Sequence, residues 1–385
     1  MVHTYIGVSP LYGFHKGFWG LLLLFFVMPF TVQGQKSWQE LEYPPLNKFE
    51  RPELDIAELS NGIRIYLLED DELPLVDITV MARTGGVQVP EGLEGLEQMV
   101  AQAMESGGSV ATPSDEMQRI LEDRAATLEV SMGFQSGQVR LNLLKENTGE
   151  LVSLLGELIV RPAYPEQDVE LARTQLKSMI SRRNDDSGQI ARREFRRLIY
   201  GADSVYGRIM EYQTLDRITR FDLVAFHEDA FIGENLMIGV AGDFDSETMK
   251  ELLEQSFGNL PRGERSQLRF PDIPFLEDSG IYFIDKRDVN QSYVLLGHLG
   301  GRRDNPDYAA LQVMNQVLSG GFSGRLFQVV RSEKGLAYAV FGSYGSNLFY
   351  PGLFTAGVLT RSPATADAID AVLHEIERLR DEPVR

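Results

Sequence analysis

The chain has 385 residues, of which 43% are hydrophobic and 24% are charged. This composition is typical of a globular protein, and the length predicts two or three domains. Lysine and arginine together number 37 against 56 aspartates and glutamates, a formal net charge of −19. That balance argues against a nucleic-acid partner, because phosphate contacts need clustered positive charge. The sequence contains no cysteine, which excludes disulfides, thiol nucleophiles and cysteine-bound metals.

The N-terminus has the layout of an export segment. His15-Lys16 precedes an apolar run from Phe18 to Val32, which is short for a membrane span and fits the core of a signal peptide. Small or modest side chains in Val32-Gln33-Gly34 predict cleavage before Gln35, and no cysteine follows that could carry a lipid. We therefore expect a periplasmic or secreted protein with no stable membrane anchor after cleavage. An uncleaved anchor is the alternative.

Beyond this segment, strand and helix patterns alternate. Asn61-Gly62 separates two apolar runs and predicts a hairpin, because both residues tolerate the positive φ of a tight turn. Apolar residues at spacings of three and four predict helices, and alternation predicts strands. The predicted elements are strands 54–60, 63–68 and 75–83, helices 93–103 and 117–128, strand 129–143, helices 148–160, 168–183, 192–199 and 222–231, strand 236–241 and helix 246–257.

The first part of this order recurs near the C-terminus. A strand that ends in Gly-Gly, two helices separated by a second Gly-Gly, a strand region and a third helix follow one another again. Their ranges are 293–300, 308–318, 323–334, 338–360 and 365–380. The recurrence predicts an α+β fold of two homologous sandwich-like domains, each an antiparallel-rich sheet with helices on one side.

The predicted domain organisation follows from the repeat. It comprises a signal peptide (1–34), an N-terminal extension (35–52), a first domain (53–261), a proline-containing linker (262–280) and a second domain (281–385). The second copy reaches Arg385 where the first copy has reached only about residue 164. We therefore expect roughly 95–100 further residues by analogy with the first copy, so that the chain is either a fragment or has a truncated second domain.

One stretch carries a family resemblance. It runs Gly320-Gly321-Phe322-Ser323-Gly324-Arg325-Leu326-Phe327 and continues through Arg331 to Tyr338. This stretch resembles the second domain of the pitrilysin/insulinase family of zinc metallopeptidases, in its shorter, processing-peptidase-like branch. Leu59-Ser60-Asn61-Gly62 and Ala241-Gly242-Asp243-Phe244 resemble the first domain more weakly, and the resemblance extends over about residues 53–380.

The family's zinc motif, H-x-x-E-H, is absent at the place where the resemblance puts it. In that family two histidines on one helix face bind zinc, and the glutamate acts as general base. Here Gly95 and Met99 stand at the histidine positions and Gln98 at the base position. The window 175–179, where a distal glutamate ligand is expected, contains no carboxylate. The resemblance therefore implies no zinc in this chain and a zinc site in a partner chain.

The remaining ionisable residues offer no obvious replacement site. Glu94 and Glu97 lie three residues apart on a predicted helix, and we expect a solvated acidic face rather than a calcium or magnesium site. We expect His227 to be a surface histidine, His298 to have a structural role at a strand end and His374 to be solvated.

Arg331 and Tyr338 are the candidate catalytic residues. The resemblance implies that they assist a partner's zinc site by donating hydrogen bonds to the peptide and its developing oxyanion. It also makes Gly320, Gly321, Phe322 and Ser323 candidate substrate-binding residues. The alternative is that Arg331 is a helix-end salt-bridge residue and Tyr338 a buried strand aromatic. Arg325 is expected to pack or pair structurally.

Three functional hypotheses follow. The first is the zinc-less subunit of an exported two-component peptidase, whose homologous zinc-bearing partner cleaves a peptide substrate. The second is a non-catalytic peptide-binding or scaffold protein of the same fold. The third is an active zinc metalloendopeptidase with an unrecognised metal site. A partner chain of the same fold that carries H-x-x-E-H favours the first.

Overall fold

The computed structural model describes residues 52–274 and 279–383. The predicted signal peptide and all but the last residue of the predicted N-terminal extension lie outside these ranges. Within the described ranges, none of the helices combines the length and the apolar character needed to cross a membrane.

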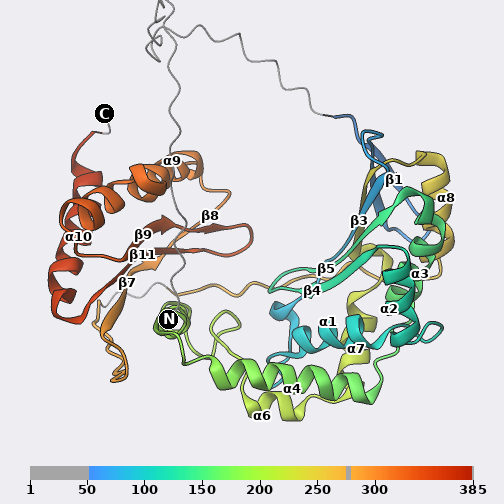
Figure 1. The fold of residues 1–385 in the computed structure, drawn as a ribbon, viewed down its shortest axis with the longest axis horizontal. Helices are drawn as coiled ribbons and strands as arrows, with labels where there is room; N and C mark the ends of the chain where they lie inside the picture. The colour runs from blue at the N-terminus through green and yellow to red at the C-terminus, as the bar shows by residue number, and fades with distance from the viewer. Residues whose placement is uncertain (1–51, 275–278, 384–385) are drawn as a thin grey trace, which may run out of the picture. The chain divides into compact units, whose positions relative to one another are not determined.

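A six-stranded sheet forms the centre of the first half (Figure 1). Its order is β1-β2-β6-β3-β5-β4, and β6 lies between β2 and β3, parallel to β2 and antiparallel to β3. The strands are β1 (Asp55–Glu58), β2 (Arg64–Glu69), β3 (Leu75–Ala82), β4 (Thr127–Met132), β5 (Gly137–Leu144) and β6 (Leu236–Gly242). Every other pairing is antiparallel, so the sheet is antiparallel-rich, as predicted.

The predicted hairpin at Asn61-Gly62 joins β1 to β2. Gly62 has φ +91°, a conformation in which a side chain would be strained. The Asn61 side-chain amide is buried and donates to the carbonyl oxygens of Phe257 at 2.9 Å and Leu260 at 3.2 Å. The turn is therefore tied to the end of the last helix of this half.

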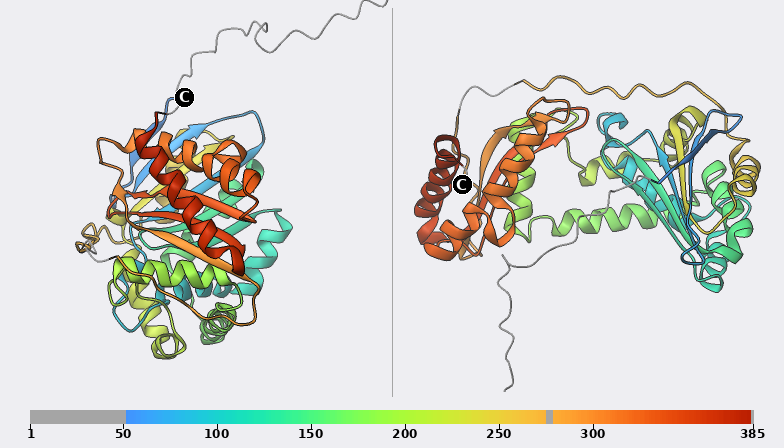
Figure 2. Two further views of the ribbon diagram at one scale, coloured as in Figure 1. Left: turned by 90° about the vertical axis from the view of Figure 1, so that its left-hand side faces the viewer. Right: turned by 90° about the horizontal axis from the view of Figure 1, so that it is seen from above.

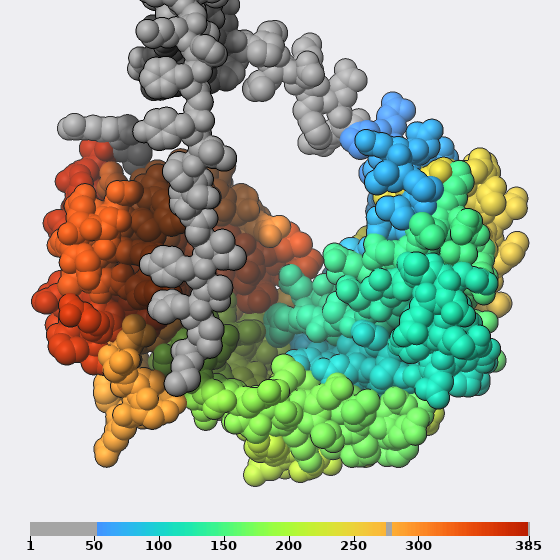
Figure 3. Space-filling view, in the orientation of Figure 1, coloured from blue at the N-terminus to red at the C-terminus, as the bar shows by residue number. Residues whose placement is uncertain are grey.

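Helices cover one face of the six-stranded sheet. Along β3, buried residues alternate with exposed or half-buried ones, so only one face of the strand is covered. The helices of this half are α1 (Leu96–Gly107), α2 (Ser114–Asp123), α3 (Thr148–Val160), α4 (Glu166–Arg182), α5 (Ser187–Tyr200), α6 (Tyr212–Arg217), α7 (Arg220–Ala230) and α8 (Ser246–Phe257). Figure 3 shows α4 and the segment after it, in green, at the molecular surface.

Two predicted elements differ from the structure. The predicted helix 117–128 is α2 and ends at Asp123, because Ala125 adopts φ +50° and β4 begins at Thr127. The predicted strand region 129–143 is a hairpin of β4 and β5 that turns after Met132. Alternation continues across that turn in the sequence, and therefore the pattern alone does not reveal it.

The second half contains a three-stranded antiparallel sheet of order β7-β11-β9 and its own cluster of buried apolar side chains. Its elements are β7 (Gln291–Leu299), β8 (Gly301–Arg302), α9 (Tyr308–Ser319), a π-helix (Phe327–Glu333), β9 (Ala339–Tyr344), β10 (Ser346–Asn347), β11 (Leu353–Arg361) and α10 (Thr365–Asp381). Helix α10 packs on β11 and lies across the sheet in Figure 2, left.

The two halves share one topology. The order β3-α1-α2-β4-β5-α3 in the first half corresponds to β7-α9-π-helix-β9-β11-α10 in the second. The strand pairing agrees as well, since β5 lies between β3 and β4 just as β11 lies between β7 and β9. This shared topology accords with the predicted α+β repeat, although part of the predicted second helix, 323–334, is a π-helix.

His227 is a core residue, so the prediction of a surface histidine was wrong. On α7 it is 6% exposed, and its ring stacks on Phe231 at 4.4 Å between centroids. Its Nε2 lies 2.9 Å from the Ile159 carbonyl oxygen, and its Nδ1 lies 3.2 Å from the Tyr164 hydroxyl. Burial lowers the pKa of His227 from 6.5 to about 4. The next residue on the helix, Glu228, is exposed.

This buried imidazole predicts a pH dependence of stability. Because the pKa of His227 is lower in the folded chain, the unfolded chain binds more protons between pH 6.5 and about 4, and stability falls as the pH falls through that range. We expect His227→Gln to reduce the loss of unfolding free energy between pH 7 and 4.5 by about 2–3 kcal/mol. Denaturant titration of both proteins at both pH values measures this. The same loss in both would contradict it.

Candidate functional site

The predicted catalytic residues lie side by side on the surface of the second half. The Arg331 guanidinium lies 5.9 Å from the centre of the Tyr338 ring and 4.7 Å from that of Phe327. Phe322 contacts Phe327 edge-on, with ring centroids 4.9 Å apart. We call these four residues, Phe322, Phe327, Arg331 and Tyr338, the Arg331 cluster.

The Arg331 cluster is exposed, and its polar groups are not used within the described chain. Tyr338 is 71% exposed and Phe322 77%, so Tyr338 is not the buried strand aromatic of the alternative interpretation. Among the described residues, no carboxylate forms an ion pair with Arg331, and no group accepts a hydrogen bond from the Tyr338 hydroxyl. The guanidinium is held by cation–π contacts with the two rings, which leaves its N–H groups available.

Local geometry explains how the sequence presents these side chains. Gly321 has φ +61° and turns the chain after α9, and the Ser323 hydroxyl donates to the Gly320 carbonyl at 3.2 Å. Leu326, directly before the π-helix, and Val330 within it are completely buried against the core of the second half. Since those residues anchor its inner face, Arg331 lies on the outer face.

A cavity of about 440 Å³ lies in the first half, where the resemblance places the zinc motif. Gly95 and Gln98 line it, together with Met179 from the window expected to supply the distal ligand. Met99 is fully buried in the core and does not line the cavity. The fold thus brings together the positions that the resemblance assigns to zinc, with the exception of Met99.

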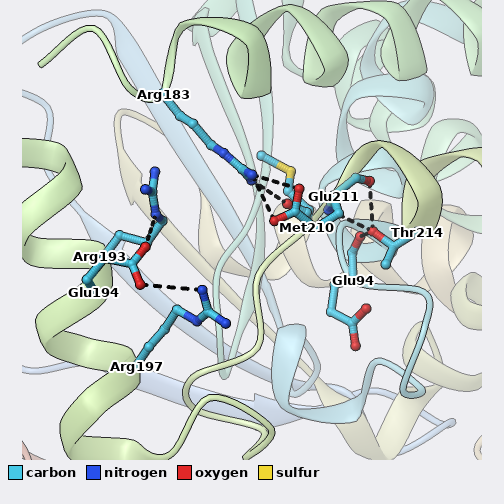
Figure 4. A network of polar contacts seen from close by, with 8 residues as sticks. All are labelled: Glu94, Arg183, Arg193, Glu194, Arg197, Met210, Glu211 and Thr214. Atoms are coloured by element: carbon cyan, nitrogen blue, oxygen red, sulfur yellow. Dashed lines mark hydrogen bonds and ion pairs between the residues drawn. The ribbon is translucent and has the colours of Figure 1, made fainter. Parts of the chain in front are cut away.

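Several charged residues of this cavity are paired, and Figure 4 shows Arg183 with Glu211 and Arg193 with Glu194. Arg208 lies 3.3 Å from Glu94, and both side chains are largely buried, at 17% and 14% exposed. Arg183 donates to both carboxylate oxygens of Glu211, at 2.8 and 2.7 Å, and to the Met210 carbonyl at 3.1 Å.

Glu94 and Glu97 do not form a solvated acidic face, so that prediction was wrong. Glu94 also accepts the Gly92 N–H at 3.0 Å, and its backbone carbonyl accepts from the Thr214 hydroxyl at 2.9 Å. Glu97 lines the cavity, and burial raises the pKa of its carboxyl. Glu94 faces inward because Arg208 and Thr214 pack over the start of α1, a contact that the helix pattern does not reveal.

The residues of the cavity do not fit a zinc ion. Gly95 precedes α1 with φ +103°, and a Cβ there would lie 2.8 Å from Leu215 and 3.3 Å from Met210. The lining contains four arginines, which repel a cation, and no histidine. Over residues 52–274 and 279–383, no group of three or more histidine, aspartate or glutamate side chains is placed to hold a metal.

The other candidate residues have simpler positions. His374 is exposed on α10, as expected, and His298 is exposed on β7, where its Nδ1 lies 2.8 Å from the Leu299 carbonyl oxygen. The side chain of Arg325 is partly buried. Sequence analysis missed Arg193, Arg196 and Arg208 of the cavity. The high arginine content between 182 and 208 was the available indication, but it does not show which arginines converge.

Comparison with known proteins defines the class. Residues 217–385 match the family model described as the peptidase M16 inactive domain. This match confirms the resemblance to the pitrilysin/insulinase metallopeptidases, and the chain lacks that family's zinc motif at Gly95, Gln98 and Met99.

Three similar proteins illustrate the relationship. An uncharacterized zinc protease of Rickettsia bellii is 23% identical, over 85% of this chain and 78% of its own. A non-peptidase homolog, YmxG, of Helicobacter pylori is 24% identical, over 80% of this chain and 70% of its own. The crystal structure of a peptidase M16 inactive domain from Pseudomonas fluorescens superposes with a TM-score of 0.77 at 22% identity, covering 86% of this chain and 80% of that one. That structural likeness supports the α+β fold.

The cavity predicts that the purified chain holds no stoichiometric zinc. Elemental analysis after dialysis should find far less than one zinc per chain, because no imidazole and no free carboxylate pair converge on the site. About one tightly held zinc per chain would contradict this prediction.

Restoring the motif alone should not create a zinc site. We expect the triple variant Gly95→His, Gln98→Glu, Met99→His to be less stable than the parent, since the left-handed backbone at 95 and the contact with Leu215 oppose any side chain. Zinc titration and thermal unfolding test this, with Gln98→Glu alone as the control. A stable triple variant that binds zinc would overturn it.

Proposed function

We propose that this chain is the zinc-less subunit of an exported, two-component M16 peptidase. In this proposal a homologous partner carries H-x-x-E-H, and this chain contributes substrate contacts. Two features support it: the zinc-motif positions are filled by residues that cannot bind zinc, while the Arg331 cluster remains intact and exposed. Export rests on the N-terminal sequence, from which we propose a periplasmic or secreted location.

The exposure of Arg331 and Tyr338, without polar partners in the described chain, is the observation that carries the proposal. Exposing a guanidinium and a phenol beside two aromatic rings gives the second half little stability. Both groups are fixed hydrogen-bond donors suited to carbonyl oxygens, and Phe322 and Phe327 offer an apolar surface to substrate side chains. Substrate peptide bound by the partner would accept hydrogen bonds from this pair.

The name of the Helicobacter pylori relative, a non-peptidase homolog, favours a second candidate, a peptide-binding or scaffold protein without a peptidase partner. The third hypothesis, an active zinc enzyme, is disfavoured because the arginine-lined cavity does not fit the metal. The first two differ in whether the Arg331 cluster affects the rate of cleavage.

We expect Arg331→Ala and Tyr338→Phe to slow peptide cleavage by the reconstituted pair about 10²–10³-fold without disturbing assembly. The loss should fall mainly on kcat, because a hydrogen bond to an oxyanion strengthens as the carbonyl becomes tetrahedral. The assay is cleavage of a peptide by the purified two-chain complex, with complex formation followed by size-exclusion chromatography.

Matched controls are available in the same half. Arg303 is exposed and Tyr282 is 66% exposed, so Arg303→Ala and Tyr282→Phe remove similar groups outside the cluster. These controls should cleave at the parental rate. Parental rates in both cluster variants, with normal assembly, would reduce the pair to structural residues and favour the scaffold function.

A further inference from the structure

The cavity in the first half has a surplus of unused arginine donors. Arg193 and Arg196 lie three residues apart on α5 and so share one face of the helix. The Nε of Arg193 donates to Glu194 at 2.8 Å, and the Nε of Arg196 donates to the Tyr206 carbonyl at 2.8 Å. Within the described ranges, the Nη groups of both side chains have no acceptor.

Arg208 adds a third unsatisfied donor. Its Nη groups reach Glu94 and the Val89 carbonyl, but its Nε is buried and has no hydrogen-bond partner among the described residues. Buried polar groups without a partner are uncommon in folded proteins, and each one calls for an explanation such as a bound ligand. Three arginines that line one cavity with unused donors therefore indicate an anionic ligand.

The local charge balance supports the same conclusion. Around the cavity, Glu211 neutralises Arg183, Glu94 neutralises Arg208, and Glu194 is shared between Arg193 and Arg197. Arg196 has no carboxylate partner within the described chain. Burial raises the pKa of Glu97, which favours its uncharged form and weakens its opposition to an anion.

The apolar and amide groups that line the rest of the cavity indicate what else the ligand carries besides its negative charge. Part of the lining is apolar, formed by Val89, Met132, Phe134, Met179, Ile180 and Ile209. The Gln98 amide also lines the cavity and can pair with a peptide N–H or C=O. A volume of about 440 Å³ is at the lower end for a ligand pocket, so it suits the end of a peptide better than an internal segment.

We propose that this cavity, at the position of the lost zinc site, binds the C-terminal carboxylate of a peptide. Arg193 and Arg196 bind the carboxylate, and the last side chain of the peptide packs on the apolar wall. Two planar guanidinium groups match the geometry of a carboxylate. The proposal concerns different residues from the Arg331 cluster, so either one can fail without the other.

Three labelled peptides test the proposal with the full chain by fluorescence polarisation. The first ends in Leu with a free carboxylate, the second is its C-terminal amide, and the third is an amide with a Glu side chain one residue from the end. We expect the free acid to bind about 10- to 100-fold more tightly than either amide. A ratio of this size corresponds to the free energy of one or two charged hydrogen bonds. The proposal would be overturned if the amide or the Glu peptide bound as tightly as the free acid. It would also be overturned if acetate competed with the free acid at the same concentration as the unlabelled peptide does.

Variants locate the site. Arg196→Gln should weaken binding of the free acid about tenfold and leave the amide unchanged, and Arg196→Lys should restore only part of the loss because it lacks the planar fork. Arg119→Gln, which removes an exposed arginine of the same half, is the control and should bind as the parent does. An unchanged affinity in folded Arg196→Gln would overturn the assignment. If circular dichroism shows that this variant is unfolded, the comparison of the acid and amide peptides on the parent chain decides whether the carboxylate is recognised.

Discussion

The packing of the segment Arg208–Thr214 over the start of α1 determines what the first half can do. Arg208 pairs with Glu94, and the Thr214 hydroxyl donates to the Glu94 carbonyl oxygen. A Cβ on Gly95 would lie 2.8 Å from Leu215 and 3.3 Å from Met210, and the φ of +103° there would strain any side chain. Gly95, directly before the helix, is left-handed, and arginines and methionines line the cavity where the resemblance places the metal. The replacement of the zinc-motif residues at these positions therefore goes together with the packing of this half.

The duplicated topology allows the two halves to carry different chemistry on the same framework. In both, a central strand lies between two antiparallel neighbours, and a helix follows it onto the covered face. In the first half, side chains near the first helix turn inward to a cavity. In the second half, the segment after α9 presents Phe322, Arg331 and Tyr338 outward, because Leu326 and Val330 hold its inner face. For the proposed function, contact with substrate without a metal, only the second arrangement would be needed.

Local patterns predicted most of the elements, because their information lies within a few residues. Helix 148–160 has the predicted bounds of α3, and the Asn61-Gly62 turn is where the sequence placed it. The predictions that were wrong concern side chains whose burial depends on contacts with residues distant in the sequence. His227 is buried because Ile159 and Tyr164, more than sixty residues earlier in the chain, accept or donate its hydrogen bonds. Glu94 is buried because Arg208 reaches it, and no periodicity in either segment shows that they meet.

Gly95, Gln98 and Met179, which the resemblance assigns to the zinc site, line the cavity, but the resemblance gave no indication of the cavity's charge. With a net charge of −19, the chain as a whole repels an anion. At physiological salt that field is screened over about 8 Å, whereas charges in a partly buried cavity are screened much less. The balance that matters for a carboxylate is therefore set by Arg193, Arg196 and Arg208 and by Glu97, whose pKa burial raises. Recognition in this cavity would depend on the geometry of a few guanidinium groups, so an acidic protein can hold an acidic ligand.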